Sequence, residues 1–466
     1  MLLMLLACAG PNDGDQEPVE SDEPVESDGP VESDEPEESD EPVETGGEGD
    51  LCTTLPDSSG YEATVNRWAE QDSLDPLSDE GWVVFTGSSS IRRWERAQQD
   101  FADWGVIQRG FGGARLDEVA LFADPLISAH DPAAIVVFAG TNDVAAGEDS
   151  DTVFQDFRCL VQRAPDVPIV YIGITPTPSR WGSWETSNAV NERVEAFAAL
   201  HPRVFYADVA EAFLQTGSPP ASELFVEDQL HLSPAGYALW TAVIKPVLKE
   251  AVPPARTPAT GGPEHGRVLV DLGPSNDDDG AQTGVVDGLT WNSWHALEGG
   301  AAVLAGEHLA LQTTEGEPSG ARLTISGQFS NNGYQNGGLQ TPDPALLGDL
   351  AVGTATGDYF FTQGSDAPGA VVLTGLNPSN EVTLRLFASR EWGSETRVTG
   401  FVVTGSTRQE GSITVSGNGV GADGYDGNTS EVAEFALLPD EHGQIVVDVR
   451  ILQGSYGYLG LLDLSW

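Results

Sequence analysis

Residue types that can hydrolyse an ester occur in four short stretches of this chain. They are Gly87–Ser90, Arg109–Gly113, Gly140–Asp143 and Asp228–His231. Ester hydrolysis needs a nucleophile, a base that activates it, a group that orients the base, and hydrogen-bond donors for the oxyanion. The hydroxyls, imidazole, carboxylates, glycine N–H groups and Asn142 amide of these stretches supply every one of these groups. The pattern therefore predicts a serine hydrolase.

The serine stretch has two interpretations when it is taken alone. It follows the apolar run Val83–Phe85, which predicts a buried strand, and it precedes a segment with helical character. A strand that turns into a helix there places a hydroxyl beside the free N–H groups of the helix. Serine is also a preferred N-cap residue, and capping is the simpler explanation of this stretch by itself. The other three stretches favour a nucleophile.

The elements that position these stretches alternate between strands and helices. The expected strands are Trp82–Thr86, Val106–Arg109, Ile135–Ala139, Ile169–Ile174 and Val204–Tyr206. The expected helices are Arg92–Phe101, Leu116–Phe122, Thr152–Arg163, Ser187–Leu200 and Ser233–Leu248. This order predicts an α/β fold with a parallel sheet between helices. Ligands bind outside the carboxyl ends of such strands, where the serine and Gly140 stretches are expected to lie.

Together, the four stretches resemble the SGNH hydrolase superfamily, the GDSL esterases and lipases, over about residues 80–252. The strings FTGSSSIRRW, QRGFGGARLDEV and DQLHLSPAGYALW are most similar to platelet-activating-factor acetylhydrolase-like esterases. The resemblance implies a flavodoxin-like three-layer sandwich and a catalytic triad of Ser89, Asp228 and His231. It also implies an oxyanion hole of Ser89, Gly113 and Asn142, and it requires no metal or cofactor. Here GSSS replaces Gly-Asp-Ser-Leu, so Ser88 stands where aspartate is usual.

The loop after the fourth expected strand contains two tryptophans, Trp181 and Trp184. They either form a wall of the substrate pocket or pack on the core as part of a proline-rich connection. The sequence does not decide between these roles.

The charge of the chain excludes two classes of partner. It has 21 basic and 73 acidic residues, a net charge of −52. Such a surface repels nucleic acid and anionic membranes, so neither is an expected partner. The expected partner is a small ester or an acylated polysaccharide, and membrane contact is expected only through a lipid anchor.

The N-terminal segment predicts export. Residues 1–8, MLLMLLAC, resemble a bacterial lipoprotein signal, which implies lipidation of Cys8 and a protein held at the cell surface or in the periplasm. The alternative interpretation is a truncated ordinary signal peptide. Residues 9–50, in which the unit EPVESD recurs imperfectly over 17–40, predict a disordered acidic linker. In an exported protein Cys52 and Cys159 can form a disulfide, although two separate thiols fit the sequence equally well.

The C-terminal part has a different pattern. A linker at 253–265 is followed by short alternating runs over 266–466, which predict an all-β sandwich. This part resembles jelly-roll carbohydrate-binding modules, and its aromatic residues either stack on sugars or lie in the core. Three functions remain: an exported esterase that removes acetyl or similar groups from carbohydrate, a lipid or lysophospholipid esterase, and a surface binding lipoprotein with a vestigial hydrolase domain.

Overall fold

The structure is a computed structural model, and it describes residues 50–53, 55–77, 81–254, 265–274, 281–294, 302–364 and 368–466. Residues Asp50–Trp466 form one compact unit. The predicted signal with Cys8, the acidic linker and most of the linker at 253–265 lie outside the described residues. Among the described helices, none has both the length and the apolar character needed to cross a membrane.

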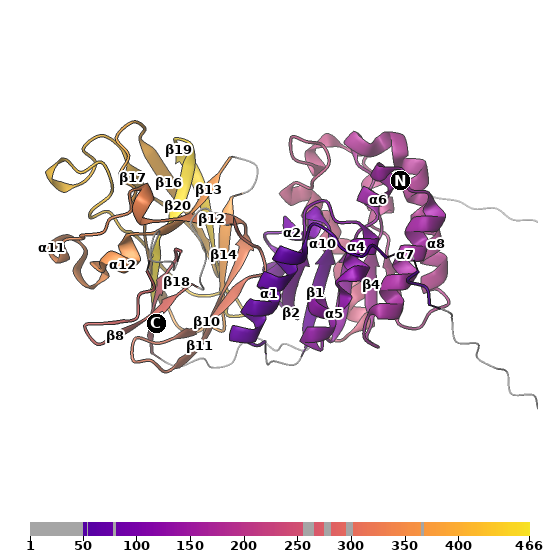
Figure 1. Cartoon of the computed structure of the whole chain (residues 1–466), viewed down its shortest axis with the longest axis horizontal. Coiled ribbons are helices and arrows are strands. Elements are labelled where there is room, and N and C mark those ends of the chain that lie inside the picture. The colour runs from indigo at the N-terminus through magenta and orange to yellow at the C-terminus, as the bar shows by residue number, and fades with distance from the viewer. Residues whose placement is uncertain are drawn as a thin grey trace, which may run out of the picture. The chain divides into compact units, whose positions relative to one another are not determined.

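The first part of the unit, residues 50–254, is called the α/β region below. Its five strands form one parallel sheet in the order β2-β1-β3-β4-β5, with helices on both faces (Figure 1). The strands are β1 Trp82–Gly87, β2 Gly105–Gly110, β3 Ala134–Phe138, β4 Ile169–Ile172 and β5 Val204–Ala207. The helices are α1 Glu62–Leu74, α2 Ser89–Arg92, α3 Ala97–Asp100, α4 Leu116–Leu121, α5 Ala123–Leu126, η1 Ser128–His130, α6 Thr141–Ala146, α7 Ser150–Arg163, η2 Pro178–Ser183, α8 Trp184–Ala198, α9 Val209–Leu214, η3 Ser222–Leu224 and α10 Pro234–Ala251. The predicted α/β fold is confirmed.

Alternating strand residues face two separate hydrophobic cores. Val84 on β1 packs into the core that includes α4 and α7, whereas Val83 packs into the core that includes α10. Both side chains are fully buried. Burial on both faces explains why these strands appear in the sequence as continuous apolar runs.

One predicted helix differs from the structure, and some helices of the structure were not predicted. The expected helix Arg92–Phe101 is instead two single turns, α2 and α3, because the chain leaves the helical path at Arg93. Helix α1 was not predicted. Its buried residues are Val65, Trp68 and Gln71. Because one of these three is polar, the amphipathic pattern of this helix is weak in the sequence.

The second part, residues 265–466, is called the β region. Three sheets run in the orders β10-β11-β14-β19-β16-β17, β20-β13-β12-β9 and β18-β15-β21-β6-β8-β7. The strands are β6 Arg267–Asp271, β7 Val285–Val286, β8 Leu289–Ser293, β9 Ala302–Val303, β10 His308–Gln312, β11 Pro318–Gly327, β12 Phe329–Asn332, β13 Tyr359–Gln363, β14 Gly369–Thr374, β15 Val382–Phe387, β16 Arg397–Thr404, β17 Arg408–Ser416, β18 Ala433–Leu437, β19 Ile445–Gln453, β20 Tyr456–Leu459 and β21 Leu461–Ser465. One core joins residues of all three sheets. The short helices are η4 Tyr334–Asn336, α11 Pro344–Leu347, η5 Gly348–Leu350, α12 Gly353–Thr356 and η6 Ala422–Gly424. The predicted β sandwich is confirmed.

The aromatic residues of the β region are divided between core and surface. Trp291, Trp294 and Tyr458 are buried, so they are core residues and cannot stack on a sugar. Trp392 is 41% exposed, and the guanidinium carbons of Arg390 and Arg397 lie 5.6 and 5.5 Å from the centroid of its ring.

The α/β and β regions share a polar interface. Arg109 is fully buried and donates to the carbonyl of Gly306 at 3.0 Å and to Asp72 at 2.6 Å. Arg322 of the β region pairs with Asp75 at 2.6 Å. A buried charge is stable only when it is paired and hydrogen-bonded, so these contacts require the two regions to stay together.

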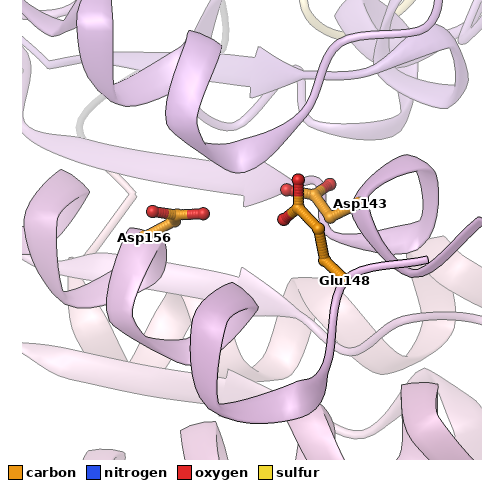
Figure 2. A group of neighbouring side chains, drawn as sticks. All are labelled: Asp143, Glu148 and Asp156. Carbon is orange, nitrogen blue, oxygen red and sulfur yellow. The ribbon is translucent and has the colours of Figure 1, made fainter. Parts of the chain in front are cut away.

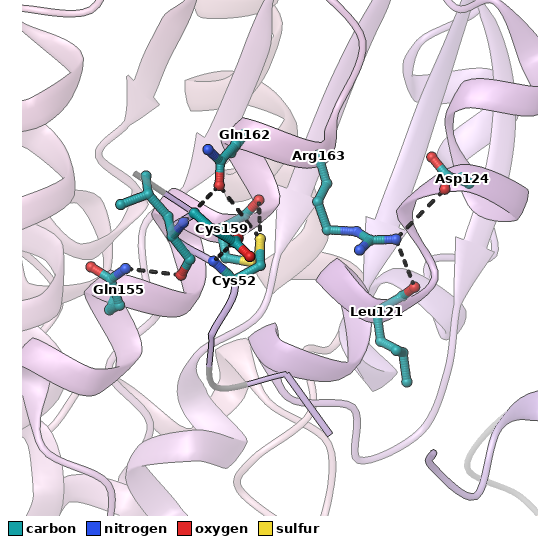
Figure 3. The surroundings of a disulfide bond; sticks show 9 residues. Cys52, Leu121, Asp124, Gln155, Cys159, Gln162 and Arg163 are labelled. Carbon is teal, nitrogen blue, oxygen red and sulfur yellow. Dashed lines mark hydrogen bonds and ion pairs between the residues drawn. A yellow bond between two sulfur atoms is a disulfide. The ribbon is translucent and has the colours of Figure 1, made fainter. Parts of the chain in front are cut away.

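A disulfide between Cys52 and Cys159 attaches the segment before α1 to helix α7 (Figure 3). The neighbouring Leu51 is held to the same helix by hydrogen bonds of its backbone to Gln155 and Gln162, each 2.9 Å long. The start of the described chain is therefore fixed next to the helix layer that contains α7.

Candidate active site

The first site residue lies where β1 turns into α2. Gly87 has φ +132°, and a Cβ there would lie 2.0 Å from the carbonyl oxygen of Phe138, so this position requires glycine. The N–H of Ser88 donates to that same carbonyl at 2.9 Å. Ser88 is 1% exposed, whereas Ser89 is half-buried and lines a cavity. Of the two, only Ser89 presents its hydroxyl to a ligand.

The other two residues of the expected triad meet Ser89 from the loop before α10. His231 Nε2 lies 2.8 Å from Ser89 Oγ, and His231 Nδ1 lies 2.6 Å from Asp228 Oδ2. The second oxygen of Asp228 accepts the backbone N–H groups of Leu230 and His231 at 2.9 and 2.8 Å. These bonds fix the carboxylate, which in turn fixes the tautomer of the imidazole as the one protonated on Nδ1.

Burial and hydrogen bonding together adjust the protonation of this pair. Burial lowers the pKa of His231 below its usual value, against the hydrogen bond that its Nδ1–H donates to Asp228, which raises the pKa. Burial alone would raise the pKa of Asp228, but the hydrogen bonds from the ring of His231 and from backbone N–H groups lower it overall. The histidine is consequently neutral, and able to accept a proton, at neutral pH.

Two of the expected oxyanion-hole residues line the same cavity. Gly113 has φ +87°, a conformation that favours glycine, and it lines the cavity together with Asn142. Asn142 donates one amide hydrogen to the carbonyl of Ala114 at 2.8 Å, and its Oδ1 accepts from Arg180 at 3.0 Å. Since arginine can only donate, the oxygen of Asn142 must face Arg180, which leaves the second amide hydrogen free to bind an oxyanion.

The cavity has a volume of about 470 Å³. Its lining joins the four predicted stretches to residues that the sequence did not single out: Tyr61, Thr64, Trp68, Arg92, Arg180 and Leu304. Tyr61 donates to the carbonyl of Gly112 at 2.7 Å and thereby supports the glycine loop. Leu304 comes from the β region, so both regions contribute to this cavity.

The expected tryptophan wall is not part of this lining. Trp181 and Trp184 stack on each other at 6.3 Å between ring centroids, and neither lines the cavity. The proline-rich loop instead contributes Arg180, because Thr177 caps the 3₁₀ turn η2 and directs Arg180 toward Thr141 and Asn142. The prediction of Trp181 and Trp184 as pocket residues is therefore not supported.

Three acids lie close to one another beside the Gly140 stretch (Figure 2). One carboxylate oxygen each of Asp143, Glu148 and Asp156 lies within 4.8 Å of the others. Burial raises the pKa of Asp143 to about 7, and its Oδ1 accepts the N–H of Leu116 at 2.8 Å. Arg115 pairs with Glu148 at 3.0 Å. This cluster therefore connects α6 to the start of α4.

Residues 75–239 match the model of the GDSL-like lipase/acylhydrolase family. Platelet-activating factor acetylhydrolase IB subunit alpha1 is 28% identical to this chain over 177 residues in both Bos taurus and Homo sapiens, covering 35% of this chain and 73% of each relative. Similar solved structures include a GDSL-like lipase of Bacteroides thetaiotaomicron (24% identity, TM-score 0.37, 41% of this chain, 99% of that one). Another is a family 3 carbohydrate esterase of Clostridium thermocellum (14% identity, TM-score 0.31, 37% of this chain, 100% of that one).

The family match covers every strand and helix that carries the Ser89, Gly113, Asn142 and His231 positions. It ends within α10, so the β region lies outside it. The α/β region thus belongs to the SGNH hydrolase superfamily, and this chain is a carboxylic ester hydrolase of the GDSL type.

Proposed function

We propose that this chain is an exported serine esterase that removes short acyl groups, acetyl above all, from carbohydrate. The observation that carries the proposal is the unbroken series of hydrogen bonds from Ser89 through His231 to Asp228, with distances of 2.8 and 2.6 Å. A vestigial hydrolase domain would not need all three side chains in this geometry.

In the proposed mechanism His231 takes the proton of Ser89 as the hydroxyl oxygen attacks the ester carbonyl. Asp228 holds the imidazole in place and stabilises the imidazolium that forms. The backbone N–H groups of Ser89 and Gly113 and the amide of Asn142 bind the oxyanion; loss of one such donor typically costs about 2.7–4 kcal/mol in the transition state. His231 then gives its proton to the leaving alcohol, and water, activated by the same histidine, cleaves the acyl-enzyme.

Three observations support a small acyl group as the substrate and the export of the protein. The cavity volume of about 470 Å³ lies within the range of small-molecule sites. The curated relatives are named acetylhydrolases. The disulfide between Cys52 and Cys159 belongs to an oxidising compartment, in agreement with the lipoprotein-like signal that ends at Cys8. We propose accordingly that Cys8 anchors the enzyme at the bacterial surface or in the periplasm.

A second candidate is a lipid or lysophospholipid esterase, because the curated relatives are named for platelet-activating factor. An acyl-chain series separates the candidates. The carbohydrate esterase should release acetate from acetylated xylan and lose activity on 4-nitrophenyl esters as the chain grows beyond butanoate. A preference for long-chain esters would favour the lipid esterase.

The experiment that tests the mechanism is Ser89→Ala, assayed with 4-nitrophenyl acetate. We expect activity to fall by at least about 10⁴-fold with an unchanged circular dichroism spectrum. Ser88→Ala is the matched control and should stay active, since Ser88 is buried and does not line the cavity. Full activity of Ser89→Ala would refute the assignment, and loss of activity only in Ser88→Ala would move the nucleophile by one residue.

A further inference from the structure

Two arginines line the same cavity as Ser89 and His231. Arg92 follows the nucleophile on α2, and Arg180 lies on the loop after β4. Both are half-buried. Their presence is unusual for this chain, because it has only 21 basic residues against 73 acidic ones. A random surface position of this protein is far more often acidic than basic.

Among the residues that the structure describes, neither guanidinium has a counter-charge. Within the described residues no carboxylate lies within 4.0 Å of Arg92 or Arg180, whereas Arg67, Arg109 and Arg115 each pair with one at 3.0 Å or less. Burial lowers the pKa of both Arg92 and Arg180 from its usual value, but arginine remains protonated in proteins. The cavity therefore holds two positive charges that the protein does not neutralise.

The hydrogen bonds of these arginines go to neutral groups. Arg180 donates to the carbonyl and hydroxyl of Thr141, both at 2.9 Å, and to Asn142. Arg92 donates to Gln328 at 3.1 Å, and its guanidinium lies against Gly112, 3.1 Å from the position a Cβ would take there. The buried Nε of Arg92 has no hydrogen-bond partner among the described residues. Neutral partners fix both side chains in position but leave their charge available to a ligand.

A half-buried charge without a partner costs free energy, and an anion in the cavity would recover that cost. The net negative charge of the rest of the protein does not prevent this, since it is screened beyond about 8 Å at physiological ionic strength. Arginine presents several donors in a plane, which suits the paired oxygens of a carboxylate or a phosphate.

We propose that Arg92 and Arg180 form an anion-binding subsite, and that the natural ester carries a carboxylate or phosphate close to the bond that is cleaved. This proposal rests on the esterase function proposed above and narrows its substrate to acylated acidic sugars, or to acyl esters with a neighbouring phosphate. Arg180 also positions Asn142, so Arg92 gives the cleaner test.

The test compares three acetylated sugars that differ only in the group at C6: methyl glucoside, which is neutral, methyl glucuronoside, which carries a carboxylate, and methyl glucoside 6-phosphate. We expect kcat/KM for one of the two anionic sugars to exceed that for the neutral sugar by about tenfold or more, because hydrogen bonds to charged groups are the strong ones. Comparison of the carboxylate sugar with the phosphate sugar shows which anion the subsite binds.

The ratio of kcat/KM for the anionic sugar to kcat/KM for the neutral sugar is then measured in variants. Arg92→Gln should lower the ratio of anionic to neutral kcat/KM by about tenfold, and Arg92→Lys should retain part of it. Arg408→Gln is the matched control, since Arg408 is exposed on β17 and lies outside the cavity. Equal kcat/KM for charged and neutral sugars, or an equal loss on both in Arg92→Gln, would overturn the proposal.

Activity on neutral 4-nitrophenyl acetate is followed in parallel. If the wild type hydrolyses this ester but shows no preference for anionic sugars, the subsite is wrong and the esterase function stands. If the wild type hydrolyses none of the esters, the proposed function itself is wrong.

Discussion

At the scale of single residues, the proposed mechanism makes activity depend on the pKa of His231. Burial lowers this pKa, and the charges of Arg93 and Arg92 lower it further, in opposition to Asp228. Because the base must be neutral, kcat/KM should rise with pH through a pKa below the usual value for histidine. Arg93 lies 4.0 Å from Asp228 Oδ2, so its charge acts directly on the pair.

We therefore predict that Arg93→Gln moves the acidic limb of the pH profile of kcat/KM to higher pH. Removal of a neighbouring positive charge makes the imidazolium easier to form, so the enzyme is inactivated at a higher pH than the wild type. Arg96→Gln, on the exposed turn before α3, provides the control and should leave the limb in place. An unshifted limb in Arg93→Gln would show that solvent screens this charge from His231.

The sequence singled out the three side chains of the proposed triad but not the residues that support them. Ser89, Asp228 and His231 each lie in a short motif, and motifs are local in sequence. The structure places Ser89 and Asp228 each within hydrogen-bond distance of His231. Tyr61 and Arg180 were missed because they contact the glycine loop and Asn142 across 51 and 38 residues of chain. No local pattern indicates such contacts. Their side chains became site residues only through the packing of α1 and η2 on the sheet.

At the scale of elements, strands were predicted better than helices. Strands β1 and β3 are fully buried, and their runs of valine, isoleucine and phenylalanine are apolar throughout. Helix α1 has a narrow apolar face with Gln71 at its edge, where the side chain donates to the carbonyl of His308 in the β region. A polar residue that is buried in an interface resembles a solvent-exposed one in the sequence, so the amphipathic pattern was not evident.

The disulfide between Cys52 and Cys159 should contribute to stability at this scale. It closes a loop with a sequence separation of 107, and a loop of that size restricts the unfolded chain strongly. We predict that Cys52→Ser lowers the free energy of unfolding by about 2–5 kcal/mol. Chemical denaturation with and without reductant measures this, since reductant should destabilise the wild type and leave Cys52→Ser unchanged. Equal stability of both proteins without reductant would refute the prediction.

At the scale of the whole molecule, the sequence predicts an α/β domain at 51–252, a linker at 253–265 and a β-sandwich domain at 266–466, and in the structure residues 50–466 form one compact unit. The reason lies in contacts between distant residues. Arg109 reaches Gly306 across 197 residues, and Arg67 pairs with Glu307 across 240. Such pairings leave no trace in composition or periodicity. The β region is therefore a structural partner of the α/β region and also supplies Leu304 to the cavity that Ser89 and His231 line.

Gly306 provides a direct test of this association. It has φ +90°, and a Cβ there would lie 1.9 Å from the carbonyl oxygen of Gln108 in the α/β region. Gly316, also in the β region, has a similar φ of +84°, but a Cβ there would approach nothing closer than 3.4 Å. Alanine at either position therefore has the same backbone strain, and only at Gly306 does it also collide with the other region.

We predict that Gly306→Ala lowers the melting temperature more than Gly316→Ala and raises KM for acetyl esters, because the displaced segment includes Leu304. The kcat should change less, since the contacts of Ser89, His231 and Asp228 with one another lie wholly within the α/β region. Thermal unfolding and steady-state kinetics of the two variants measure both effects. If the variants lose equal stability and keep the same KM, the β region is not coupled to the site, and its role must be sought in binding elsewhere.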